Sequence, residues 1–184
     1  MRSRVLCVVS IAVLILIVGG ASAQEAEVER WGWCTLDGSW IGSSPMWGSS
    51  WLVEYQSVNL WKGSFTLRFV GGDPSAGGAF PVESQSIAVG SWVRTGRRSF
   101  DYTMVYYGLA AGGQQPVVLV KLTGGVATAN DCQTLEVYNE SYSLYDPTQD
   151  PFGADDPLYG CFPDSGVSPA QRVPVQDSCM TPIP

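Results

Sequence analysis

Alternating apolar and polar residues indicate β-strands along much of the chain from residue 51 onward. In residues 51–58 (WLVEYQSV) every second position is apolar or aromatic, and residues 63–70 (GSFTLRFV) alternate in the same way. A period of two places alternate side chains on opposite faces of a strand. The faces expected to be buried carry Trp51, Val53, Tyr55, Phe65, Leu67 and Phe69.

The densest pattern lies in residues 87–107 (IAVGSWVRTGRRSFDYTMVYY), which predict two strands joined by a turn at residues 95–99. The parity of this turn decides which residues share a face. We favour an even loop, because it puts Arg94 and Asp101 on one face as an ion pair. Val93 would then lie beside Phe100, and Trp92 would lie on the opposite face.

The remaining segments complete an all-β pattern. Strands are expected at residues 117–128, 134–145 and 158–162, with a short closing strand at 170–175. Gly124 and Gly125 predict a bulge or bend within the first of these, and residues 134–145 carry polar side chains on both faces. Seven to nine strands at turn spacing, with no sustained helical period, indicate an antiparallel sandwich or barrel with little helix.

The first residues are typical of an export signal. Basic residues precede an apolar run at 5–18, and residues 21–23 (ASA) match a signal-peptidase site. The run is shorter than the roughly 20 residues that cross a bilayer, although an uncleaved anchor is the alternative. We expect a signal peptide at 1–23, a flexible segment at 24–33, one barrel domain at 34–175 and a tail at 176–184. The mature chain would be secreted, extracellular or periplasmic.

Charge and cysteine content narrow the partners and the compartment. The net charge of −7 disfavours nucleic acid and anionic membranes as partners, and the oligomeric state stays open. Four cysteines follow the signal, and an even number in an exported chain predicts two disulfides. The favoured pairs are Cys34–Cys132 and Cys161–Cys179.

The chain has no histidine, which excludes several catalytic chemistries. Ser-His-Asp and Cys-His nucleophiles and the common zinc hydrolases all need that residue. No cofactor and no metal are expected, although loop carboxylates would be the ligands of any calcium ion. The loop residues concerned are Asp146, Asp150, Asp155 and Asp156. Glycosidase chemistry needs two carboxylates, and Glu54, Asp101, Glu136 and Glu140 are the candidates.

Residues 90–100 (GSWVRTGRRSF) resemble the G-x-W-x-R-T-G-x-R-x-F signature of secreted bacterial calycin-like (lipocalin-like) β-barrel proteins of uncharacterised function. Residues 144–147 (LYDP) and the short strand with Cys161 are similar to that family as well. The resemblance implies a closed barrel of about eight antiparallel strands. It also implies that Arg172 on the last strand packs against Trp40 of a Gly38-Ser39-Trp40 triplet.

Three functions fit these patterns. The first is a lipocalin-like barrel that binds a small, mostly apolar ligand; the second is a barrel isomerase or cyclase resembling allene oxide cyclase. A buried carboxylate, Glu54 or Glu136, would favour that enzyme. The third is a structural or sugar-binding domain, with Trp31, Trp33, Trp40 and Trp47 as a stacking row. The candidate ligand-binding residues are Phe100, Tyr102, Met104, Tyr106, Trp92 and Arg94.

The arginines of the hairpin allow two interpretations. Arg94, Arg97 and Arg98 are the densest basic cluster of an acidic chain. They are either an anion clamp at the barrel mouth or solvated turn residues with one ion pair to Asp101.

Overall fold

The computed structural model describes residues 33–44, 48–71, 80–164 and 166–174. The chain divides into two compact units, Met1–Thr35 and Leu36–Pro184, and every strand belongs to the second. The described residues form strands and turns without an α-helix, which confirms the all-β prediction. The expected signal peptide and the tail at 176–184 lie outside the described residues. So does all of the predicted N-terminal segment except Trp33.

The strands are β1 (Gly38–Ser44), β2 (Ser49–Asn59), β3 (Lys62–Val70), β4 (Ser84–Gln85), β5 (Ala88–Arg94), β6 (Ser99–Leu109), β7 (Pro116–Thr128), β8 (Thr134–Tyr145), β9 (Tyr159–Asp164) and β10 (Ser168–Arg172).

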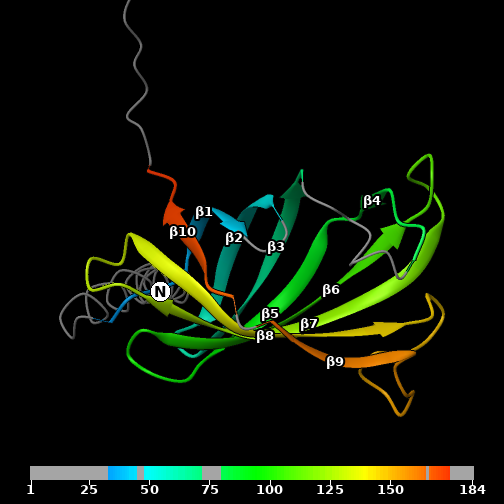
Figure 1. Ribbon diagram of the computed structural model, residues 1–184. Coiled ribbons are helices and arrows are strands. Elements are labelled where there is room, and N and C mark those ends of the chain that lie inside the picture. The colour runs from blue at the N-terminus through cyan, green and yellow to red at the C-terminus, as the bar shows by residue number, and fades with distance from the viewer. Residues whose placement is uncertain (1–32, 45–47, 72–79, 165, 175–184) are drawn as a thin grey trace, which may run out of the picture. The chain divides into compact units, whose positions relative to one another are not determined.

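Eight of these strands close an antiparallel barrel. β1, β2, β3, β5, β6, β7 and β8 pair in that order, and β10 closes the barrel by pairing with both β8 and β1. β4 adds only two residues beside the end of β6. β9 pairs with the second half of β8, so that β9 and β10 leave β8 in different directions (Figure 1). The barrel is consistent with the calycin-like fold that the sequence resemblance implies.

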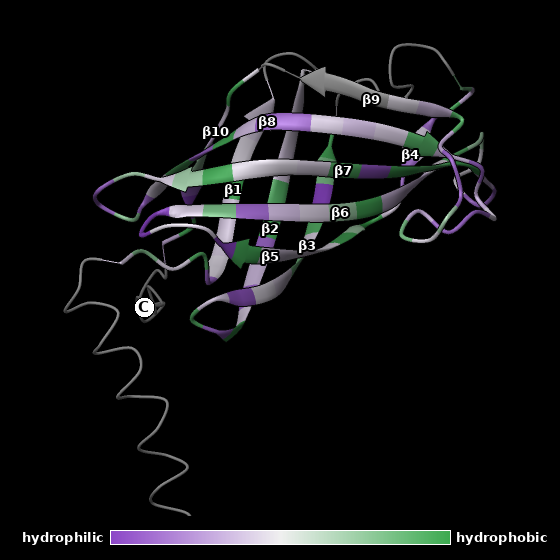
Figure 2. Cartoon of the chain, turned by 90° about the horizontal axis from the view of Figure 1, so that it is seen from below, coloured by the Kyte–Doolittle hydropathy of each residue, from purple (hydrophilic) through white to green (hydrophobic). Residues whose placement is uncertain are grey.

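The predicted alternation places the core inside this barrel. Trp51, Val53 and Tyr55 of β2 are buried, as are Phe65 and Leu67 of β3, and the residues between them are exposed. β5 to β8 run side by side, with β1 to β3 crossing behind them (Figure 2). The apolar faces of the two groups of strands therefore meet in one core.

The hairpin of β5 and β6 differs from the prediction. Arg94 pairs with Phe100 and Trp92 with Tyr102, so the turn has an odd number of residues. Trp92 and Arg94 therefore share the buried face with the aromatic residues of β6, while Val93 is half exposed and opposite Asp101. The even loop was wrong because it gave weight to a surface ion pair, which contributes little to the free energy of unfolding.

Trp40 and Arg172 confirm the contact that the resemblance implied. Trp40 is fully buried and pairs across the strands with Arg172, whose guanidinium carbon lies 4.6 Å from the centre of the indole ring. The Trp40 Nε1–H donates a hydrogen bond of 2.8 Å to the Leu36 carbonyl oxygen. The packing of Arg172 on Trp40 therefore connects β1, the first strand of the barrel, to β10, the last.

Cys34 and Cys132 are disulfide-bonded, which is the first pair that the sequence predicted. The second predicted pair, Cys161 and Cys179, falls outside the side chains that the structure describes. Within the described residues, no helix is both long enough and apolar enough to cross a membrane.

Candidate functional site

A β-bulge in β8 shapes the interior of the barrel. Thr123 of β7 pairs with Ser141, but Gly125 pairs with Tyr138, so that one residue of β7 faces two residues of β8. The extra residue is Asn139, whose φ of 53° lies in the left-handed region. Asparagine tolerates that conformation better than most residues, because its side chain can hydrogen-bond locally.

The bulge reverses which residues of β8 face inward. Before it, Leu135 and Val137 are buried; after it, Glu140 and Leu144 are buried. An uninterrupted strand would have turned Glu140 outward. The polar residues on both faces of residues 134–145 are therefore explained by a change of register within one strand.

Glu140 is the only buried carboxylate among the described residues, with 9% of its surface exposed. Its Oε1 accepts a hydrogen bond from the Tyr102 hydroxyl of β6. Because β7 lies between β6 and β8, the Tyr102 side chain has to cross β7 to make this contact.

Gly124 makes that crossing possible. Gly124 of β7 is the cross-strand partner of Tyr102, and a Cβ at this position would lie 2.9 Å from both Cε1 and the hydroxyl oxygen of Tyr102. That distance is shorter than van der Waals contact allows. The glycine therefore leaves the space in which the Tyr102 ring reaches Glu140.

Three tyrosines respond to the charge of Glu140. The pKa values of Tyr55, Tyr102 and Tyr106 are all raised above the ordinary tyrosine value, first because burial disfavours the phenolate and then because of Glu140. Their hydroxyl groups therefore stay protonated around neutral pH. Glu140 lies within electrostatic reach of phenol groups from two different strands.

Tyr102, which contacts this carboxylate, belongs to a set of packed aromatic rings. The ring centres of Tyr55 and Phe65 are 5.1 Å apart, and Phe65 meets Tyr102 edge to face at 5.9 Å. Phe69 and Tyr106 form a further pair at 5.1 Å. The buried carboxylate thus adjoins a cluster of aromatic rings, and a mostly apolar lining with a few polar groups is typical of small-molecule sites.

Glu140 also lies where the pairing partner of β8 changes from β10 to β9. Val137 is the last residue of β8 that pairs with β10, through Ser168, and Glu140 begins the pairing with β9, through Asp164. The pairing of β8 with β10, which closes the barrel, therefore stops before Glu140.

The six predicted ligand-binding residues are all buried, and five of them form two groups. Tyr102 contacts Glu140, and the charge of Glu140 also acts on Tyr106. Trp92, Phe100 and Arg94 stack at the turn end of the hairpin, with the Trp92 and Phe100 rings perpendicular at 5.4 Å. Met104 is buried on the same face of β6.

Arg94 donates hydrogen bonds to backbone carbonyl oxygens of two turns. Its Nε–H donates to the Leu60 carbonyl oxygen at 2.8 Å and its Nη1–H to the Arg97 carbonyl oxygen at 2.9 Å. Its guanidinium carbon lies 4.6 Å from the centre of the Phe100 ring. Burial lowers the pKa of Arg94, and the charge of Asp37 opposes that shift. Arg94 thus connects the β2–β3 and β5–β6 turns from inside, facing away from the expected partner Asp101.

The sequence placed the candidate carboxylate at the wrong positions. Glu54 and Glu136 are exposed on the outer face of the barrel, as is Asp101. Glu140 was one of four glycosidase candidates and the only one that faces inward. The sequence feature that could have indicated the inward turn of Glu140 is Asn139 together with Gly124-Gly125. Asparagine and glycine are both typical of bulges, and a bulge reverses the faces of a strand.

The predicted sugar-stacking row is not present as a unit. Trp40 is fully buried against Arg172 and cannot stack on a ligand from outside. Trp33 is half-buried, and Trp31 and Trp47 lie outside the described residues.

The loop aspartates cap turns of their own segment. Asp146 Oδ1 accepts hydrogen bonds from the Thr148 backbone N–H at 2.9 Å and from its hydroxyl at 2.6 Å. Asp150 Oδ1 accepts from the Phe152 N–H, and Asp155 Oδ2 accepts from the Asp150 N–H. In the described part of the chain, no three acidic or cysteine side chains group as metal ligands would.

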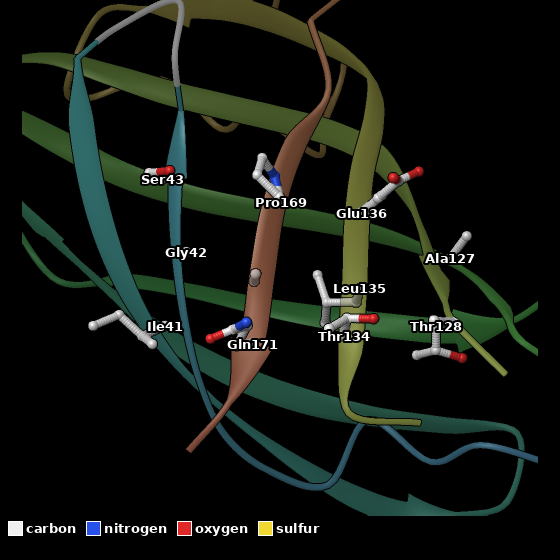
Figure 3. A pocket seen from close by; sticks show the side chains of 12 residues that line it. Ile41, Gly42, Ser43, Ala127, Thr128, Thr134, Leu135, Glu136, Pro169 and Gln171 are labelled. Atoms are coloured by element: carbon white, nitrogen blue, oxygen red, sulfur yellow. The ribbon is translucent and has the colours of Figure 1, made fainter. Parts of the chain in front are cut away.

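A separate groove of about 620 Å³ lies over β1, β10, β8 and β7 (Figure 3). Outward side chains such as Ile41, Glu136 and Gln171 line it, and none of the predicted ligand-binding residues does. Its walls come from segments far apart in the sequence, so no local pattern could have indicated it.

No protein-family model and no curated protein matches this chain. Among solved structures, that of EF1p2_mFAP2b bound to DFHBI is similar, with a TM-score of 0.46 and 13% identity over 82% of this chain and 98% of that chain. A likeness of this strength carries no inference about function.

Proposed function

We infer that this chain is an exported barrel protein that binds one small, mostly apolar molecule in its interior, beside Glu140. The observation that carries the proposal is the buried Glu140 carboxylate, held by Tyr102 in a mostly apolar interior. Ligand sites are mostly apolar, with a few placed polar groups that fix orientation. Glu140 and the phenol groups near it have that role.

The cost of this arrangement supports the proposal. Burying a carboxylate costs several kcal/mol before its contacts offset that cost. This barrel nevertheless buries the carboxylate. It also has a bulge in which Asn139 adopts the left-handed conformation, and a glycine at 124 where a Cβ would meet Tyr102. Local features that lower stability are concentrated at functional sites, and bulges often re-aim side chains there.

Export is part of the same proposal. The signal pattern at 1–23 and the Cys34–Cys132 disulfide both fit an oxidising compartment. The proposed mature chain begins at Gln24 and carries one barrel domain between a short N-terminal segment and a tail. The intact mass of the exported protein tests this, and a product that begins at Met1 would contradict it.

Native mass spectrometry of protein purified from its source tests ligand binding. We expect a bound small molecule that is released on unfolding. The neutral dye Nile red should also bind, with a rise in its fluorescence, because its affinity rests on apolar contact. Protein that is free of ligand at its source and does not bind the dye would overturn the proposal.

A second candidate function is a proton-transferring isomerase or cyclase. The hydrogen bond between Tyr102 and Glu140 favours it, because a phenol and a carboxylate in contact form a proton donor and acceptor pair. Incubation of the released molecule with fresh protein tests this. An isomerase would give a product of equal mass and different retention, and Tyr102→Phe would remove that conversion.

A further inference from the structure

We propose that the outer face of β5 and its two neighbours, β3 and β6, binds a second copy of this chain, so that the protein forms a two-fold symmetric dimer. Lys62 of each copy lies against Asp101 of the other, and Val89 and Val93 of the two copies pack together between these pairs. This surface is on the outside of the barrel, so its role is independent of what the interior binds.

A row of large apolar side chains is exposed along β5. Ile87, just before the strand, and Val89 on its outward face are each 52% exposed, and Val93 is 50% exposed. The half-buried Val105 of β6 is the cross-strand partner of Val89 and extends this apolar surface sideways. Contiguous exposed apolar surface on a soluble protein marks interaction sites. The outer face of β5 therefore favours contact with another protein surface over contact with water.

The two flanks of β5 carry opposite charges at the same level. Lys62 of β3 and Asp101 of β6 are both cross-strand partners of Val93, and both side chains are exposed. The next two rows have uncharged residues on both flanks: Ser64 and Thr103 around Ser91, and Thr66 and Val105 around Val89. The face thus has one base and one acid placed symmetrically about an apolar strand.

This arrangement is complementary to itself. In a two-fold symmetric contact, residue i of one copy meets residue j of the other, and j meets i. An axis along β5 places β3 of one copy over β6 of the other with no shift along the strand. Lys62 then meets Asp101 of the other copy at two places, and Val93 lies beside its own equivalent.

The same geometry is the reason to favour a second copy over a different protein. A partner has to present an acid and a base about 10 Å apart, the width of two strand spacings, on either side of an apolar row. This chain presents that combination itself. Burial of the apolar row drives the association, and the two exposed ion pairs fix its orientation and register.

The size of the face predicts a weak dimer. β5 has seven residues and is therefore about 23 Å long, and contact along three strands buries on the order of 1,000 Å² in total. That area lies at the lower limit for a specific interface. We expect a Kd on the order of 10 μM, so that monomer and dimer exchange within an accessible range of concentration.

Sedimentation velocity of the purified protein, from about 1 to about 300 μM, tests the dimer over a range that brackets this Kd. Lys62→Asp sets two carboxylates against each other at both contacts, and Asp101→Lys sets two ammonium groups against each other. Each variant alone should raise the Kd by at least about tenfold, because two attractive contacts become repulsive. Glu136→Lys carries the same change of charge as Asp101→Lys on the outer face of β8, and it should keep the Kd of the parent protein.

A mixture of the two variants identifies the contact. When Lys62→Asp meets Asp101→Lys, both pairs become attractive again, so the equimolar mixture should form dimers that neither variant forms alone. Recovery in the mixture also shows that both variants are folded. The double variant, which has the net charge of the parent protein, should dimerise as the parent does.

Three results would overturn the proposal. The first is a protein that stays monomeric over the whole range of concentration. The second is a dimer that neither charge reversal weakens, because the second copy then binds elsewhere. The third is a mixture of the two variants that does not dimerise although each gives the circular dichroism spectrum of the parent protein.

Discussion

The side chain of Arg94 connects the β2–β3 turn to the β5–β6 turn. Its guanidinium group is buried, and it donates to carbonyl oxygens of two separate turns while it lies over Phe100. Each hydrogen bond from a charged donor contributes about 1.5–3 kcal/mol to the free energy of unfolding, and its removal loses that contribution. The turns at residues 60 and 97 would each lose a partner without it.

Replacement of Arg94 should therefore destabilise the protein. We expect Arg94→Met to lower the free energy of unfolding by about 2–4 kcal/mol, and Arg94→Lys by nearly as much, because an ammonium group cannot reproduce the fork of donors. Urea unfolding gives both values. Arg68→Met, on the exposed face of β3, should stay within about 0.5 kcal/mol of the parent protein. An Arg94→Lys variant as stable as Arg68→Met would contradict this role.

Gly124 and Gly125 provide a matched pair at the same scale. A Cβ on Gly124 would meet the buried Tyr102 ring, and a Cβ on Gly125 would meet the Tyr138 ring, which is partly exposed and can move outward. We expect Gly124→Ala to cost about 1–3 kcal/mol and Gly125→Ala clearly less. Thermal unfolding measures both. Equal effects would show that the crossing of Tyr102 over β7 does not depend on Gly124.

Among the elements, β8 decides what the interior contains. Its first half closes the barrel through β10, its second half carries β9, and the bulge between them turns Glu140 inward. A strand without the bulge would turn the Glu140 side chain outward. One residue with positive φ therefore changes the chemistry of the whole interior.

Substitutions at Asn139 test the conformation of the bulge. Because φ is 53° there, Asn139→Gly should be neutral or slightly stabilising, whereas the β-branched Asn139→Val should cost about 1–2 kcal/mol. Chemical unfolding measures the difference. A valine variant that is as stable as the glycine variant would mean that the bulge is not held in this conformation in solution.

At the scale of the whole molecule, the barrel keeps several phenol groups neutral. Burial, with Glu140, raises the pKa of Tyr55, Tyr102 and Tyr106 in the folded state. In the unfolded chain a tyrosine ionises near pH 10. The stability from these groups is therefore complete below about pH 10 and is lost as the pH rises above that value, because only the unfolded chain then gains the phenolate form.

Alkaline titration checks this linkage. We expect the tyrosinate absorbance to rise in two stages, the second coinciding with unfolding followed by circular dichroism. Tyr106→Phe should reduce the second stage. A titration in which all tyrosines ionise while the fold persists would contradict the burial of these groups.

Much of the fold was accessible from the sequence. The alternation in residues 51–58 and 63–70 predicted which side chains would be buried, and the resemblance around residues 90–100 predicted a closed barrel with Arg172 on Trp40. Such predictions succeed because burial of a strand face is a local property with a period of two. The favoured Cys34–Cys132 pair was also correct.

The sequence by itself determined that this chain is all-β, which residues form most of its strands, and that aromatic side chains of β2 and β3 lie inside. Only the tertiary structure decided that Arg94 faces inward and that Glu140, instead of Glu54 or Glu136, is the buried carboxylate. The physical reason is register. The parity of one turn and one extra residue in β8 reverse the faces of whole strands, and both depend on contacts between strands that are distant in the chain.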